Sequence, residues 1–206
     1  MRHATRTLKT LTEAETKAIL DATSRSDDDL RDHMILAVAL GTGLRVSELV
    51  ALNVGDVRSG KGAKGLWTLR AETTKGGKGG TTSLPERLRR KVSRLIKWKA
   101  DRGEPLNSDA PLFLSRGGGR DGKKRGGRMS VRTAQHVFST WQLRCGFDRR
   151  VNFHALRHTY CTNLWRLTRD ILLVMQGARH SSPSTSAIYT HPTSEDVLQA
   201  VQNLPC

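Results

Sequence analysis

The stretch FHALRHTY, residues 153–160, sets two histidines on either side of one arginine. His154 and Arg157 are three residues apart, and His154 and His158 are four apart. On a helix, side chains at these spacings share one face. Such a face suits a metal ion or a phosphate, or it is an ordinary solvated surface.

Zinc is the first candidate, because His154 and His158 have the spacing of the HExxH metalloprotease helix. That motif needs a glutamate beside its first histidine as the general base, and Ala155 stands there instead. Arg157 lies between the histidines and would repel a dication. We therefore expect no metal, and a phosphate fits better because the arginine fork matches two phosphate oxygens.

The composition points to a polyanionic partner. The 206 residues contain 35 lysines and arginines against 19 acids, a net charge of +16, and nucleic acid is the commonest partner of so basic a chain. The cysteines at 145, 161 and 206 form no CxxC pair, which fits a reducing compartment. No signal peptide and no apolar run of membrane-spanning length is present, so we expect a cytoplasmic protein with no membrane partner.

The hydrophobic pattern predicts an α+β fold that is mainly α-helical with a small antiparallel β-sheet. Strands over 65–70 and 81–85 flank a glycine-rich turn at 73–80, in a sheet of two or three strands. A capping box of Thr12 and Glu15 starts the first helix. We predict helices over 12–22, 27–40 (ended by Gly41 and Gly43), 45–53, 86–101, 130–144, 153–167, 169–177, 183–190 and 194–203.

Two segments concentrate the positive charge. Residues 87–99 hold seven basic residues and no acid, interleaved with apolar ones, which predicts a helix with a cationic outer surface. Residues 116–128 hold six basic residues and six glycines with one aspartate. Such a composition cannot bury enough apolar surface to fold alone, so we predict a flexible basic loop there.

Three further stretches supply groups suited to phosphate chemistry. In GTGLRVSEL, residues 41–49, Arg45 follows the end of an apolar helix, and Glu48 is placed to hold its guanidinium. The alternative is an ordinary exposed arginine. In TTKGGKGG, residues 73–80, Lys75 at the tip of a hairpin could act as an acid, or it belongs to a plain charged turn.

The third stretch is GARHSSPSTSAIYTH, residues 177–191, with His180 before a serine/proline turn and Tyr189 nine residues later. The other tyrosine, Tyr160, is expected to pack. Tyr189 lies among small and polar neighbours, a poor place for a core anchor. A tyrosine hydroxyl has a pKa of about 10, so it needs a base and a polarised target to act as a nucleophile.

TGLRVSEL, HALRHTYCTNL and RHSSPSTSAIYTH, in this order, resemble the boxes of the tyrosine recombinase catalytic domain, in the phage integrase and Xer-like family. The resemblance spans residues 12 to about 200. It implies the tyrosine recombinase catalytic-domain fold and DNA strand cleavage and rejoining that needs no metal, ATP or other cofactor. It also implies a bacterial, archaeal, phage or plasmid origin.

The resemblance implies six catalytic residues: Arg45, Lys75, His154, Arg157, His180 and Tyr189. The two arginines would hold the non-bridging oxygens of one DNA phosphate and stabilise its transition state. Tyr189 would attack the phosphorus and become joined to the 3′ phosphate, freeing a 5′ hydroxyl.

The remaining three groups would move protons or donate hydrogen bonds. Lys75 would protonate the leaving oxygen, with Lys78 as the alternate because the glycine-rich turn leaves the register open. His154 would be the base or proton shuttle near the tyrosine, and His180 a further hydrogen-bond donor to the phosphate.

Double-stranded DNA is the expected partner, gripped through its backbone by basic side chains. The candidate DNA-binding residues are Lys78, Arg87, Arg90, Lys91, Arg94, Arg120, Lys123, Lys124, Arg125 and Arg132. Arg132 with Gln135 and His136, on the 130–144 helix, could also read bases.

The chain departs from the family pattern in two places. Arg179 precedes His180 where the family often has glycine, which would add a phosphate contact or loosen the turn. Family members usually carry an N-terminal core-binding domain. We expect residues 1–11 to be a tail or linker and 12–206 to be the catalytic domain, with the core-binding domain absent.

At the other end, residues 194–204 read as an amphipathic helix. In the family such a tail docks on a neighbouring protomer, which implies a homo-oligomer, a tetramer, on DNA; packing against its own domain is equally expected. We therefore predict a site-specific recombinase or integrase. The alternatives are a nicking and rejoining enzyme similar to type IB topoisomerases, and a DNA-binding protein without catalysis.

Overall fold

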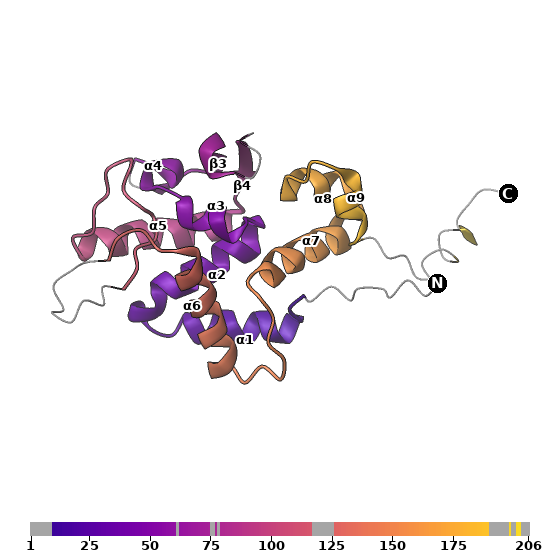
Figure 1. Cartoon of the computed structure of the whole chain (residues 1–206), viewed down its shortest axis with the longest axis horizontal. Coiled ribbons are helices and arrows are strands. Elements are labelled where there is room, and N and C mark those ends of the chain that lie inside the picture. The colour runs from indigo at the N-terminus through magenta and orange to yellow at the C-terminus, as the bar shows by residue number, and fades with distance from the viewer. Residues whose placement is uncertain are drawn as a thin grey trace. The chain divides into compact units, whose positions relative to one another are not determined.

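In the computed structural model, the described residues are 10–60, 62–74, 77, 79–116, 126–189, 198, 201 and 202. The chain divides into two compact units, residues 1–160 and 161–206, and each is described by itself. Helices dominate, with short antiparallel strand pairs, so the predicted fold class is confirmed (Figure 1). The assignment of 12–206 to one catalytic domain stays a prediction.

The first unit is built around α2 (Leu30–Thr42), of which eleven of the thirteen residues are buried. Its neighbours are α1 (Glu13–Thr23), α3 (Val46–Ala51), α5 (Glu86–Asp101) and α6 (Val131–Arg144) (Figure 1). A helix that is apolar on nearly all sides has to be buried. α2 is therefore the centre of the core.

Both ends of α2 are fixed locally. The predicted start near Asp27 is a 3₁₀ turn, η1 (Asp27–Asp29), whose cap Ser26 accepts a hydrogen bond from the backbone N–H of Asp28. At the far end Gly43 adopts the left-handed conformation, with φ of 61°. Gly41, which we expected to end the helix, stays inside it, and a Cβ there would lie 2.8 Å from Leu88 of α5. Glycine at this position permits the close approach of the two helices.

The strands form two separate pairs rather than one sheet of two or three. β1 (Arg58–Ser59) pairs with β2 (Gly62–Ala63), and β3 (Leu66–Leu69) pairs with β4 (Gly80–Ser83). In β3 the side chains of Trp67 and Leu69 are buried and the alternate ones are exposed, as expected for a strand with one face on the core.

The region predicted as one helix over 45–53 is two. α3 ends at Ala51, and Asn53 caps a further short helix, α4 (Val54–Val57), where the Asp56 carboxylate accepts the backbone N–H of Asn53. The predicted turn after β3 begins with a 3₁₀ helix, η2 (Ala71–Thr73). These differences follow from local caps that the periodicity of apolar residues does not reveal.

α7 (His154–Thr168) begins in the first unit and ends in the second, which also contains α8 (Ile171–Ala178) and α9 (Pro183–Ala187). α8 packs against α9. Of the predicted helix 194–203, the described residues 198, 201 and 202 are helical. Nowhere in the described ranges does a helix have both the length and the apolar character needed to cross a bilayer.

Gly43 gives the first test of this packing. A Cβ at position 43 would lie 2.3 Å from Cδ1 of Tyr160, in addition to the strain of a positive φ. We expect Gly43→Ala to lower the free energy of unfolding by about 2–4 kcal/mol. Gly60→Ala is the matched control, because its φ is also positive, at 56°, but nothing lies within 4 Å. It should lose only about 1 kcal/mol in urea unfolding, and equal losses would contradict the contact with Tyr160.

A buried polar chain joins α1, α2 and α5. The Thr23 hydroxyl donates to the carbonyl of Ile19, so it accepts from Nδ1 of His33 at 2.9 Å. Nε2 of His33 is then the acceptor for the Lys91 ammonium at 3.0 Å. Burial and the charge of Lys91 lower the pKa of His33 to about 4. The folded chain therefore keeps this imidazole neutral.

The His33 pKa predicts a loss of stability in acid. The unfolded chain takes up the proton near pH 6.5 and the folded chain only near pH 4, so His33 stabilises the fold above pH 6.5 and loses this contribution between those values. Between pH 7 and pH 4.5 the loss should be about 2–3 kcal/mol. Urea unfolding of the wild type and of His33→Gln at both pH values measures it, since the variant should lose less. Parallel pH profiles would exclude His33 as the cause.

Candidate active site

Arg45 is the residue that caps the N-terminus of α3, and Glu48 fixes it there. The buried Glu48 carboxylate accepts the backbone N–H of Arg45 at 2.8 Å and its guanidinium Nη1 at 2.9 Å. The predicted role of Glu48 in holding this guanidinium is confirmed. In the described part of the chain no other group bonds the Arg45 side chain, which is 29% exposed.

Arg157 lies on α7 and is only 2% exposed. Its Nη1 donates to the carbonyl oxygen of Gly43 at 2.5 Å. Gly43 is the left-handed residue at the end of α2, two residues before Arg45. The loop 43–45 thus carries one arginine and binds the other.

His154 and His158 share one face of α7, as predicted, with ring centroids 4.5 Å apart and planes at 85°. Burial lowers the pKa of His154, and the charges of Arg157 and Arg45 lower it further. Burial, His154 and Arg157 lower the pKa of His158 to about 4. Both imidazoles are therefore neutral at pH 7, and His154 is able to accept a proton.

A cavity of about 160 Å³ opens beside these groups. Arg157 and His154 line it together with Gln135 of α6, which the sequence pointed to as a base reader. Asn152, before the start of α7, also lines it, and nothing in the sequence singled out this residue. Apolar walls beside a few converging polar groups are typical of a ligand site.

The second unit holds His180 and Tyr189, whose rings are parallel within 8° with centroids 6.2 Å apart. His180 follows Arg179, which adopts a left-handed φ of 55° at the C-terminus of α8. Glycine avoids the steric cost that such a residue carries, about 1 kcal/mol. Nδ1 of His180 lies 2.7 Å from Oγ of Ser186, a contact that no motif in the sequence indicates.

Of the two tyrosines, one lies as expected and the other does not. Tyr160 packs over Gly43, as predicted. Tyr189 is buried, with 7% of its surface exposed, although its small and polar sequence neighbours suggested otherwise. Its backbone N–H donates to the carbonyl of Ser186 at 3.0 Å.

Several basic side chains of α5 already have partners within the protein, which the sequence alone does not indicate. Arg90 lies 3.7 Å from Glu86, Arg94 pairs with Asp27, and Lys91 donates to His33. Arg132 is exposed in the first turn of α6. Several predicted residues lie outside the described ranges: Lys75, Lys78, Arg120, Lys123, Lys124 and Arg125.

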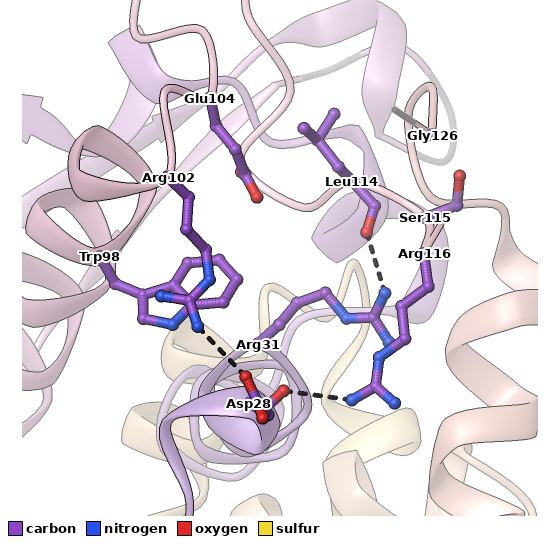
Figure 2. Close-up of a pocket in the computed structure, with 9 residues that line it drawn as sticks. All are labelled: Asp28, Arg31, Trp98, Arg102, Glu104, Leu114, Ser115, Arg116 and Gly126. Atoms are coloured by element: carbon purple, nitrogen blue, oxygen red, sulfur yellow. Dashed lines mark hydrogen bonds and ion pairs between the residues drawn. The ribbon is translucent and has the colours of Figure 1, made fainter. Parts of the chain in front are cut away.

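A larger cavity, about 490 Å³, lies where η1 meets α5 (Figure 2). Arg102 stacks on Trp98 at 4.2 Å and bonds the Asp28 carboxylate, while Arg116 donates to the Asp28 carbonyl. Arg31 is bonded to Asp32 and to the carbonyl of Leu114. These charges neutralise one another within the protein.

No trio of His, Cys, Asp or Glu suited to a metal occurs among the described residues.

Comparison with known proteins identifies the family. Residues 9–196 match the family model described as the phage integrase family. The chain belongs to the phage integrase family. It is 30% identical to tyrosine recombinase XerA of Pyrococcus furiosus, over 94% of this chain and 61% of the relative. It is 33% identical to XerC of Proteus mirabilis, over 79% of this chain and 48% of the relative.

Solved structures agree on the fold. The crystal structure of XerA recombinase matches with a TM-score of 0.73 and 26% identity, covering 96% of this chain and 65% of that one. XerH bound to its difH substrate, a post-cleavage complex, matches with a TM-score of 0.72 and 23% identity, covering 98% and 55%. The integrase-family chain thus spans about half to three-fifths of the curated relatives it matches.

The Glu48–Arg45 pair has a matched control in the same chain. Glu86 and Arg89 have the same spacing and the same 2.9 Å separation, but their side chains are 57% and 45% exposed. The Glu48 side chain is 1% exposed. We expect Glu48→Gln to lower the free energy of unfolding by about 2 kcal/mol, because it leaves a partly buried guanidinium without its counter-charge. Glu86→Gln should cost less than about 0.5 kcal/mol in the same urea titration. A smaller loss for Glu48→Gln would show that Arg45 is held by something else.

Proposed function

We propose that the protein is a site-specific DNA recombinase or integrase that cleaves and rejoins DNA through a 3′-phosphotyrosyl intermediate. The observation that carries the proposal is the loop 43–45, which bears Arg45 and binds Arg157 beside a neutral His154. The relatives named as tyrosine recombinases and the XerH complex with its DNA substrate support it.

The two arginines would stabilise the negative charge that develops on the phosphate. A phosphodiester under attack approaches two negative charges, and fixed guanidinium groups stabilise them without reorganising. Arg45 would use the part of its guanidinium that Glu48 leaves free. The energy of the broken bond is kept in the phosphotyrosine, so rejoining needs no ATP.

Proton transfer follows from the same electrostatics. In the free protein burial lowers the pKa of His154, and the charges of the two arginines lower it further. A bound phosphodiester offsets the arginine charges, which raises this pKa and makes His154 a better acceptor for the Tyr189 proton. Tyr189 has to leave its buried setting to attack. Lys75, or Lys78, would return a proton to the 5′ oxygen.

DNA binding and assembly complete the proposal. Double-stranded DNA would be bound along its backbone by the basic residues named above, with Arg132, Gln135 and His136 of α6 as candidate base readers. Residues 194–204 would dock on a neighbouring protomer and link a homotetramer on DNA. Since relatives occur in bacteria and archaea, we place this activity in the cytoplasm, with the DNA.

A suicide substrate tests the chemistry. The protein is incubated with duplexes that carry a nick within randomised sequence. Cleavage close to the nick releases a short fragment that bears the 5′ hydroxyl, and the covalent intermediate is trapped because this fragment diffuses away and cannot be rejoined. We expect a protein–DNA adduct for the wild type and for Tyr160→Phe, and at least a 10³-fold lower yield for Tyr189→Phe, because the nucleophile is removed.

Each other outcome points to a different reading. An absent wild-type adduct would favour a DNA-binding protein without catalysis. An adduct that persists in Tyr189→Phe would mean that another residue is the nucleophile. Adducts without products joined between two duplexes would favour an enzyme similar to type IB topoisomerases.

A further inference from the structure

We propose that Ser186 is a positioning residue for His180: its hydroxyl donates to Nδ1 and keeps the imidazole proton on Nε2. This inference rests on the proposed function, in which His180 donates a hydrogen bond to the scissile phosphate. Both residues lie in the second unit, on α9 and just after α8.

The contact is short and sheltered. Oγ of Ser186 lies 2.7 Å from Nδ1 of His180, and Ser186 has no exposed surface. The backbone N–H of His180 donates to the carbonyl of Met175 at 2.9 Å, which fixes the main chain that carries the ring. The imidazole is thus held from its backbone and from Nδ1.

The direction of the hydrogen bond follows from what else Ser186 can reach. Buried hydroxyls on the other helices donate back to the carbonyl four residues earlier, as Thr23, Thr42 and Thr159 do. The Ser186 hydroxyl makes no such bond, and within the described residues Nδ1 of His180 is its one partner. A buried hydroxyl proton without an acceptor costs about 1–3 kcal/mol. The proton therefore points at Nδ1.

The tautomer follows directly. A neutral imidazole carries one proton, so a ring that accepts at Nδ1 donates at Nε2. Nε2–H is the form that His180 needs to donate to a phosphate oxygen while uncharged. The opposite tautomer would present a lone pair to the phosphate and repel it.

Ser186 also holds the nucleophile that we propose. Its carbonyl accepts the backbone N–H of Tyr189 at 3.0 Å, and the rings of Tyr189 and His180 are parallel. Ser186 thus sets the tautomer of His180 through its side chain, and its carbonyl binds the backbone N–H of Tyr189.

Histidine nitrogen NMR tests the tautomer without any DNA. In ¹⁵N-histidine-labelled protein at pH 8, long-range ¹H–¹⁵N spectra distinguish protonated from unprotonated ring nitrogens, and the signal absent from His180→Asn identifies His180. We expect Nε2 to be protonated and Nδ1 to be unprotonated in the wild type and in Ser186→Thr, which keeps the hydroxyl. Ser186→Ala should show a mixture of tautomers. A wild-type ring protonated at Nδ1 would overturn the proposal, even if Ser186→Ala fails to fold.

The rate of adduct formation on the nicked duplex tests the role in catalysis. Ser186→Ala should slow it about tenfold, less than the roughly hundredfold or more expected when a transition-state donor is removed outright. DNA affinity should not change, and Ser186→Thr should restore the rate. Ser184→Ala is the matched control, because Ser184 is on the same helix and its hydroxyl bonds the N-cap residue Ser182 rather than His180.

The outcomes separate the two proposals. A wild-type chain that forms no adduct would refute the function and leave the tautomer result standing. A wild-type chain that forms the adduct while Ser186→Ala reacts at the same rate would refute the role of Ser186 alone.

Discussion

The hydrogen bond from the Arg157 guanidinium to the carbonyl of Gly43 is the constraint on which the first unit depends. A charged group this deeply buried needs partners, because losing its hydration without them costs several kcal/mol. The end of α2 provides one, since the last carbonyls of a helix lack intrahelical donors and carry its negative dipole end. The left-handed turn at Gly43 that exposes this carbonyl also starts the chain toward Arg45. The same turn at Gly43 therefore determines where the central helix ends and where both arginines lie.

Gathering cations without a bound anion is unfavourable, and the fold reduces the cost in two ways. Glu48 neutralises Arg45 from a buried position, and the histidines on α7 stay uncharged. Among the described candidate groups of this unit, the two arginines carry the positive charge at pH 7. A phosphate would meet fixed donors whose placement was settled during folding.

The sequence was sufficient for the large elements and for the grouping around Arg45 and Arg157. Long helices such as α5 and α6 follow from apolar spacing, and Glu48 was identified because it lies one turn from Arg45. The break at Asn53 and the separate strand pairs were missed, because capping contacts decide them. The burial of Tyr189 and its link to Ser186 were also missed, since small polar neighbours in sequence say nothing about which groups fold over them.

The aspartates of η1 change how the composition should be understood. Asp27, Asp28 and Asp29 each pair with an arginine, Arg94, Arg102 and Arg116 respectively. Arg94 belongs to α5, the helix with the highest density of basic residues, and Arg102 is its C-cap. Cations that are already matched by carboxylates displace few counterions when a polyanion arrives. If all three arginines stay paired, the logarithm of DNA affinity should fall against the logarithm of ionic strength with a slope about 3 units shallower than if they all bound phosphates. The count of 35 lysines and arginines thus overstates the number of cations that are available to bind a nucleic acid.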